Sequence, residues 1–185
     1  MYGGERKFGR DLETGRMLEN SYFGEVPVTE EMRREFRSLE EEHGGRIPAA
    51  EMFGVVRKHQ VDDPENPRRD LPREIRLAVA DRLKVSEDDL DNVKFYSAVG
   101  TPVDHLLGVD AWIEYDDPSR EVSAIGTMDV TYRQDKIQEG HKADVVFGEL
   151  SDINSDEYLD EVEDIARVLA DKMKDEIGRG ALRAA

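Results

Sequence analysis

Two aspartates on neighbouring apolar segments have the clearest potential for chemistry in this sequence. Asp110 lies near the start of GVDAWIEYDD, and Asp129 lies near the end of EVSAIGTMDVTYRQ. The turn-forming segment 116–119 separates these β-branched and aromatic runs, which predicts a β-hairpin. Antiparallel pairing would bring both carboxylates to one end of the sheet. Carboxylate oxygens suit Mg²⁺, Mn²⁺ or Ca²⁺, and such a metal can activate water and neutralise charge on a phosphate.

Side chains alternate between the two faces of a strand, so the pattern also predicts what shares a face with each aspartate. Asp129 and Thr131 should point to the same side, and Asp110 should share its face with Trp112 and Glu114. The intervening apolar residues of the first strand should take the other face. An alternative reading is structural, because aspartates at strand ends often form turns or solvate a sheet edge.

Three basic or titratable side chains lie close enough in sequence to assist at such a site. Lys136 or Lys142 would steady the attacking water or the phosphate, and His105 would act as a phosphate donor or a base. The alternative for His105 is a structural hydrogen bond.

The stretch 98–147 resembles the core of the PD-(D/E)XK nuclease-like superfamily. It reads AVGTPVDHLLGVDAWIEYDDPSREVSAIGTMDVTYRQDK and continues to KADVVF, and it covers about a quarter of the chain. In that family a strand-borne Asp is followed by a strand carrying (D/E)-x-K. The resemblance implies a restriction-endonuclease-like core, with Asp110 as the first metal ligand and Asp129 as the second, holding Mg²⁺ or Mn²⁺.

The resemblance also implies an acidic residue on the helix before the sheet, for which Glu74 and Glu87 are both available. The sequence departs from the family at Thr131, which stands where the family has its lysine. A migrated lysine such as Lys136 would compensate for this change, or catalysis would be lost.

A rival constellation spans residues 152–163. Its oxygen-bearing side chains follow the spacing of a calcium loop: Asp152, Asn154, Asp156, Tyr158, Asp160 and Glu163. Glu157 occupies the sixth position, where such a loop needs glycine for its sharp turn. The alternative is an acidic helix start, with Asn154 or Ser155 as the cap.

Composition sets limits on the classes of function. The chain of 185 residues has 43 acidic and 26 basic residues, a net charge of −17 and no cysteine. This charge disfavours coating of nucleic acid and is compatible with a basic protein partner, or with solubility alone. The lack of cysteine excludes disulfides, thiol nucleophiles and cysteine zinc sites. No apolar run is long enough for a membrane span or a signal peptide, so we expect a cytoplasmic protein without membrane contact.

The elements that must position these residues follow from hydrophobic spacing and capping signals. Helices are predicted over 29–43 and 48–59, from 71 onward, over a short stretch from 86 to 93, and from 155 towards the C-terminus. A third strand is predicted within 143–150. The fold class is therefore α+β, with a small mixed sheet, formed by the hairpin and the third strand, flanked by helices.

The proline-rich, charged stretch 62–70 is the best candidate for an internal boundary. We therefore expect a flexible N-terminal arm over 1–25, a helical extension over 26–70 and a core domain over 71–180. No dinucleotide fingerprint, phosphate-loop motif, nucleophile elbow or paired-histidine zinc motif is present in the sequence.

Two functions are compatible with these patterns. The first is a metal-dependent nuclease acting on phosphodiester bonds. The second is a noncatalytic relative of the same fold that uses its acidic surface to bind a basic protein, with the helices of 29–59 as a docking arm.

Overall fold

The computed structural model of the chain describes residues 15–117, 122–132 and 143–184. Its centre is a four-stranded mixed sheet with the strand order β1-β2-β3-β4. Strands β1 to β3 pair antiparallel, and β4 pairs parallel with β3. The strands are β1 Val93–Ser97, β2 Ala111–Asp117, β3 Val122–Val130 and β4 Val145–Phe147. The protein is thus α+β, with a mixed sheet flanked by helices, as the sequence predicts.

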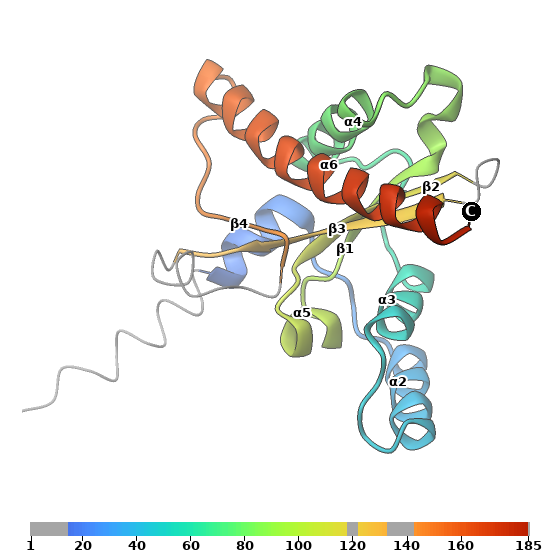
Figure 1. The fold of residues 1–185 in the computed structure, drawn as a ribbon. Coiled ribbons are helices and arrows are strands. Elements are labelled where there is room, and N and C mark those ends of the chain that lie inside the picture. The colour runs from blue at the N-terminus through green and yellow to red at the C-terminus, as the bar shows by residue number, and fades with distance from the viewer. Residues whose placement is uncertain (1–14, 118–121, 133–142, 185) are drawn as a thin grey trace, which may run out of the picture.

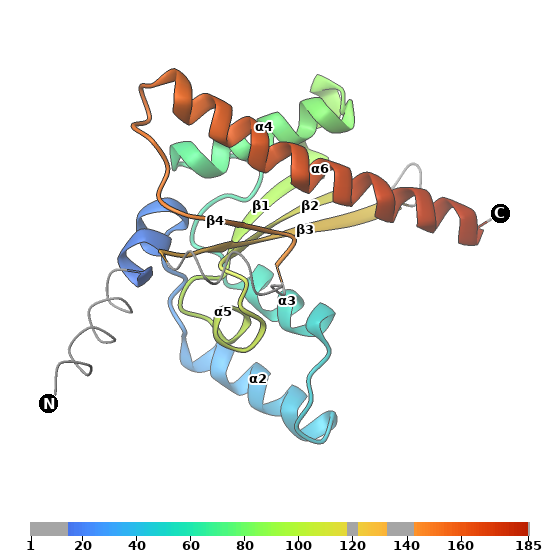
Figure 2. The same ribbon diagram turned by 60° about the vertical axis from the view of Figure 1, so that its left-hand side comes forward.

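Helices cover both faces of this sheet (Figures 1 and 2). Two long helices lie on one face, and the other face is covered by a helical pair and a short helix. The first two are α4 Asp70–Leu83 and α6 Asp156–Ala184, and the others are α2 Glu30–Glu42, α3 Ala49–Lys58 and α5 Pro102–Leu107. A further helix spans residues 15–23, and a 3₁₀ helix, η1, spans Glu87–Asn92. None of the helices in the described part of the chain has the length and apolarity needed to cross a membrane.

Local signals determine where the helical pair begins. The Thr29 side chain accepts a hydrogen bond from the Met32 amide at 3.1 Å, which satisfies one of the free donors at the start of α2. Two glutamates in its first turn suit the positive end of the helix. Met32 and Phe36 form its buried side. These are the residues from which the sequence predicts this helix.

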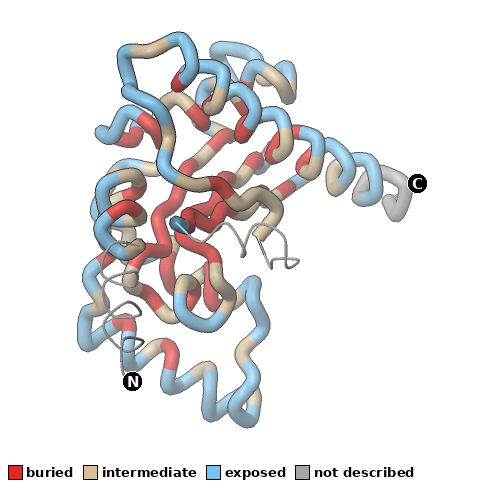
Figure 3. Tube along the Cα trace, turned by 90° about the vertical axis from the view of Figure 1, so that its left-hand side faces the viewer, coloured by how far each residue is buried: buried red, intermediate tan, exposed pale blue. Residues whose placement is uncertain are grey.

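The two faces of β2 carry different side chains, as strand alternation requires. Ala111, Ile113 and Tyr115 pack in the core beneath α4 and α6, whereas Trp112 packs in a second core on the opposite face. Figure 3 shows the buried strands at the centre, between helices that are exposed on their outer sides.

The core beneath α4 and α6 is mainly aliphatic. Ile75 and Val79 of α4 and Leu169 of α6 are fully buried there. At Gly126 of β3, an added Cβ would lie 2.9 Å from Leu169 Cδ2, so this position needs glycine for α6 to lie so close to the sheet.

The second core is aromatic and contains a polar anchor. The Trp112 ring stacks on Tyr96 with ring centroids 5.0 Å apart, and Phe53 of α3 lies at 4.8 Å. The Glu114 carboxylate accepts hydrogen bonds from Arg57 Nε at 2.7 Å and from Trp112 Nε1 at 2.8 Å. These contacts fix α3 to the centre of β2.

Parts of the chain that the sequence assigns to an arm and to an extension pack against the sheet. Residues 15–23 form a helix whose Leu18 and Phe23 are buried in the main core, so this part of the expected arm is integrated in the fold. Residues 1–14 lie outside the described residues. Apolar side chains of the segment 26–70, the expected helical extension, form much of the second core on the sheet itself.

Besides the helix 15–23, two elements were not expected from the sequence. Strand β1 lies directly after the expected short helix, and α5 lies between β1 and β2. The expected short helix itself is the 3₁₀ helix η1.

Candidate functional site

Asp110 is fixed by three hydrogen bonds at the entry to β2. Its backbone N–H donates to the Met128 carbonyl at 2.9 Å, and its own carbonyl accepts from the Ala98 amide at 2.7 Å. Its side-chain Oδ2 accepts from the Val130 amide at 2.7 Å. The residue is only 2% exposed. The carboxylate is therefore held at the point where the ends of β1, β2 and β3 meet.

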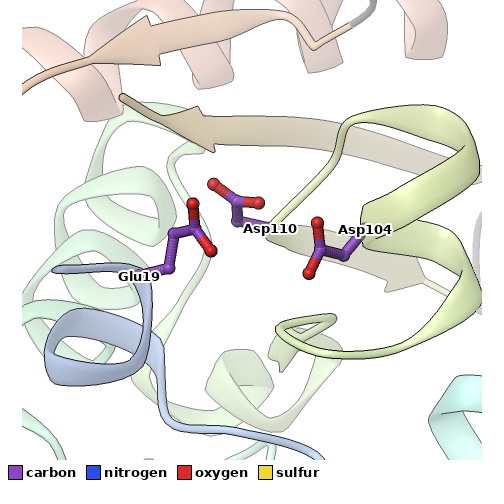
Figure 4. A group of neighbouring side chains, drawn as sticks. All are labelled: Glu19, Asp104 and Asp110. Carbon is purple, nitrogen blue, oxygen red and sulfur yellow. The ribbon is translucent and has the colours of Figure 1, made fainter. Parts of the chain in front are cut away.

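Three carboxylates from separate parts of the chain gather at this point (Figure 4). Glu19 comes from the helix 15–23, Asp104 from α5, and Asp110 from the start of β2. One carboxylate oxygen from each lies within 4.8 Å of the other two. The side chains point toward one another in Figure 4, and their spacing would allow all three to bind one cation.

The start of α5 positions Asp104. The Thr101 hydroxyl accepts from the Val103 amide at 3.2 Å and caps this helix, and Pro102 follows as its first residue. The Gly100 amide donates to Asp104 Oδ2 at 2.8 Å. Gly100 has φ +83°, a conformation that favours glycine. One Asp104 oxygen is thus oriented by the backbone of the turn.

Packing against the core positions Glu19. Leu18 and Phe23 of the same helix are buried, and the Phe23 ring lies 5.7 Å from the Phe95 ring of β1. The Tyr22 hydroxyl accepts a hydrogen bond from the Leu150 amide at 2.7 Å. The helix is therefore attached both to β1 and to the segment that follows β4.

The environment strongly disfavours a negative charge on Asp110. Burial and, to a smaller extent, the nearby charges of Glu19, Asp129 and Asp104 raise the pKa of Asp110 from 3.8 to about 9, against the opposing effect of the Val130 amide. Without a cation, this carboxyl group holds its proton at neutral pH. A divalent cation would compensate the same repulsion and displace that proton.

Asp129 lies opposite Asp110 across the two strands. Ala111 pairs with Met128, and extending this antiparallel register by one residue pairs Asp110 with Asp129. Both aspartates are buried, and both belong to the sheet face that carries Trp112. The structure therefore places the two aspartates side by side on neighbouring strands, while the group of three carboxylates within 4.8 Å of one another does not include Asp129.

Thr131, which stands where the nuclease-like family has its lysine, directly follows the last residue of β3. Thr131 is buried, and its amide donates to the Phe147 carbonyl at 2.9 Å, which holds the end of β3 beside β4. Lys136 and Lys142, the basic residues expected to assist, lie outside the described residues.

No protein-family model, no curated protein and no solved structure matches this chain. The site is therefore defined by the chain's own geometry.

The two acids considered for the preceding helix lie elsewhere. Glu74 is on α4, where its side chain lies beside the buried Tyr158 side chain of α6. Burial first, and then Glu74, raises the pKa of Tyr158. Because α4 and α6 cover the opposite face of the sheet, Glu74 is not part of the carboxylate group at Asp110. Glu87 is exposed on η1.

His105 is exposed on α5, where its Nδ1 lies 3.9 Å from Asp104 Oδ1. It borders the carboxylate group and is available to solvent.

The calcium-loop spacing over residues 152–163 corresponds to a helix start. The Ser155 hydroxyl accepts from the Tyr158 amide at 3.1 Å and caps α6, while Asp152 Oδ1 accepts from the Asn154 amide at 2.9 Å. The Tyr158 side chain points into the main core, and Glu163 accepts hydrogen bonds from Arg82. These side chains do not converge on one point, which supports the capping interpretation.

Sequence reasoning missed Glu19 and Asp104. A signal existed for each. Leu18 and Tyr22 are four residues apart, as on one helix face, and the order Thr-Pro-Val-Asp at 101–104 is typical of a helix start. Neither signal indicates that these helices meet at Asp110.

Proposed function

We propose that the chain is a metal-dependent nuclease-like protein that hydrolyses phosphodiester bonds of nucleic acid, with Asp110 and Asp129 as ligands for Mg²⁺ or Mn²⁺. One observation carries this proposal. The buried carboxylate of Asp110 lies opposite Asp129 and within 4.8 Å of carboxylate oxygens of Glu19 and Asp104.

The donor set fits a hard divalent cation. All of its side-chain donors are carboxylate oxygens, which Mg²⁺ and Mn²⁺ prefer over nitrogen or sulfur ligands. When bound, such an ion would supply positive charge near a phosphate and a more acidic bound water. The chain's own residues orient the donors, since the Val130 amide holds Asp110 and the Gly100 amide holds Asp104.

The strand arrangement supports a restriction-endonuclease-like core as part of the proposal. The strand that begins after Asp110 is the direct neighbour of the strand that carries Asp129, as the resemblance requires. Thr131 remains a departure, and in this proposal Lys136 takes the role of the missing lysine.

The first experiment is calorimetric titration of Mg²⁺ and Mn²⁺ into the wild-type protein and the variants Asp110→Asn and Asp129→Asn. Both variants keep the size of the side chain and remove its charge, so we expect metal binding to weaken at least tenfold, which corresponds to about 1.4 kcal/mol. Asp116→Asn, on the exposed part of β2, is the matched control and should bind as the wild type does.

A cleavage assay on single- and double-stranded DNA and RNA completes the test. We expect metal-dependent cleavage that both site variants lose and that the Asp116 control keeps. Metal binding that is unchanged in Asp110→Asn would refute the assigned site, and binding without cleavage of any substrate would refute the enzymatic part.

A second candidate is a noncatalytic protein of the same fold that binds a basic protein. The observation that favours it is the exposed acidic end of α2, where Glu40, Glu41 and Glu42 follow one another in a chain of net charge −17. Binding of a Lys/Arg-rich protein should then weaken steeply as the salt concentration rises, and Asp110→Asn should leave it intact. Binding that does not respond to salt would contradict this candidate.

A further inference from the structure

The edge of β3 is only partly covered by β4. Strand β3 spans Val122–Val130, whereas β4 pairs with it only from Met128 to Val130. Within the described residues, the stretch 122–127 therefore has β2 on one side and no strand on the other, although the Thr127 carbonyl already accepts from the Asp144 amide at 3.1 Å. Such an edge presents backbone donors to which another strand can add.

Two acidic side chains accept hydrogen bonds from two backbone amides of this stretch. Glu176 Oε2, from α6, accepts from the Ile125 amide at 3.1 Å. Asp144 Oδ2, just before β4, accepts from the Thr127 amide at 2.9 Å and from the Thr127 hydroxyl at 2.7 Å. Each carboxylate takes the place that a carbonyl of a neighbouring strand would occupy.

Lys172 holds the two carboxylates together. Its Nζ lies 3.5 Å from Asp144 Oδ1 and 3.7 Å from Glu176 Oε1. A cation between two acceptors reduces their repulsion and keeps both beside the strand. The three residues thus form one connected unit along the edge.

The edge is reachable from outside. A groove of about 390 Å³ runs beside it, between α6 and Phe53 of α3, and its lining includes Ser123, Ile125 and Thr127. Ser123 is exposed.

We propose that Asp144 and Glu176 guard this edge, so that a second copy of the chain cannot add its own β3 strand there. The partner that these carboxylates exclude is a second copy of the chain. Two β3 edges that pair antiparallel are related by a two-fold axis, so the backbone donors of each strand meet the acceptors of the other. The two carboxylates also place like charges on both sides of any such contact, which opposes the pairing further. This inference is independent of the proposed nuclease activity.

The test compares Asp144→Ala/Glu176→Ala with Asp171→Ala/Asp175→Ala by sedimentation velocity over a range of protein concentrations. The second variant removes the same charge from exposed positions of α6. We expect concentration-dependent dimers only for the first variant. At low concentration, its Ile125 and Thr127 amides should exchange hydrogen about tenfold faster than in the wild type, as expected for the loss of one hydrogen bond each. At high concentration, the dimer should protect them again.

A first variant that folds and stays monomeric at all concentrations would overturn the proposal. Equal association of the Asp171/Asp175 variant would also overturn it, because charge loss alone would then explain the dimer. Glu176→Ala alone, which frees only the Ile125 amide, provides the same comparison if the double variant does not fold.

Discussion

The two faces of the sheet are built on different principles. Beneath α4 and α6, aliphatic side chains pack so closely that Gly126 is needed for Leu169 to fit. On the opposite face, stacked aromatic rings surround the Arg57–Glu114 anchor, and the same face carries buried carboxylates at its end.

The two faces should therefore respond differently to substitution. The aliphatic face gains most of its free energy from burying apolar area, and its buried Arg76 guanidinium donates hydrogen bonds to the carbonyls of Val93 and Leu90. The other face contains groups whose ionisation is unfavourable in the absence of a partner, as at Asp110. We therefore expect substitutions on the first face to lower stability, and selected substitutions on the second face to raise it.

The largest effect should come from the aliphatic face. Leu169→Ala removes a fully buried side chain and leaves a cavity above Gly126, so we expect the free energy of unfolding to fall by about 3 kcal/mol. Urea denaturation measures this change. Leu159→Ala, on the same helix but 54% exposed, should change it by less than about 0.5 kcal/mol. Similar losses in both variants would contradict the packing described for α6.

Asp110→Asn, on the face that carries the carboxylates, should raise the free energy of unfolding instead of lowering it. The pKa of Asp110 is about 9 in the folded protein, whereas its ordinary value, which applies to the unfolded chain, is 3.8. Between pH 4 and 9 the folded protein therefore holds a proton on Asp110 that the unfolded chain releases. The stability of the metal-free wild type should therefore fall as pH rises through this range, by up to about 1.4 kcal/mol per pH unit from this group. The variant lacks this dependence.

Urea denaturation in the presence of a chelator at pH 5, 6, 7 and 8 tests this expectation. The stability of Asp110→Asn relative to the wild type should rise by on the order of 2 kcal/mol or more across the series. Asp116→Asn, on the exposed end of β2, should follow the wild type at every pH. Parallel pH curves for wild type and Asp110→Asn would show that Asp110 is ionised in the folded protein.

The smallest of the three effects should come from the polar anchor of the second core. Arg57→Ala leaves the Glu114 carboxylate, whose side chain is 13% exposed, with the Trp112 donor and without its cation, so we expect a loss of about 1–2 kcal/mol. Lys58→Ala is the matched control, because Lys58 pairs with Glu35 at a 66% exposed position and should matter little. Equal losses of stability in the two variants would show that the Arg57–Glu114 contact contributes no more than an exposed ion pair.

Local signals predicted most of the fold. The Thr29 cap and the spacing of Met32 and Phe36 act within a few residues, and the helix that they predict is present in the structure. The two predicted strands pair as a hairpin, although Asp116 and Asp117, which were expected in the turn, belong to β2. Strand alternation also predicted correctly that Ala111 and Trp112 face different cores.

Long-range contacts could not be predicted in the same way. Strand β1 has five residues and is defined by its pairing with β2 rather than by a pattern of its own. The carboxylate group combines Glu19 with Asp110, about ninety residues later in the chain, and no local signal connects them. Asp129 could be placed beside Asp110 because a hairpin links the two strands within a short stretch.

The hydrogen bond between Tyr22 and Leu150 joins segments 128 residues apart. During synthesis the N-terminal helix emerges first, yet the segment to which it binds is made only after β4. The Tyr22–Leu150 bond can therefore form only after β4 has been made, whereas the packing of Phe23 on Phe95 of β1 involves residues that are made earlier. A growing chain that has not reached Leu150 already contains Glu19, Asp104 and Asp110, but it lacks the bond that ties the helix of Glu19 to the segment after β4.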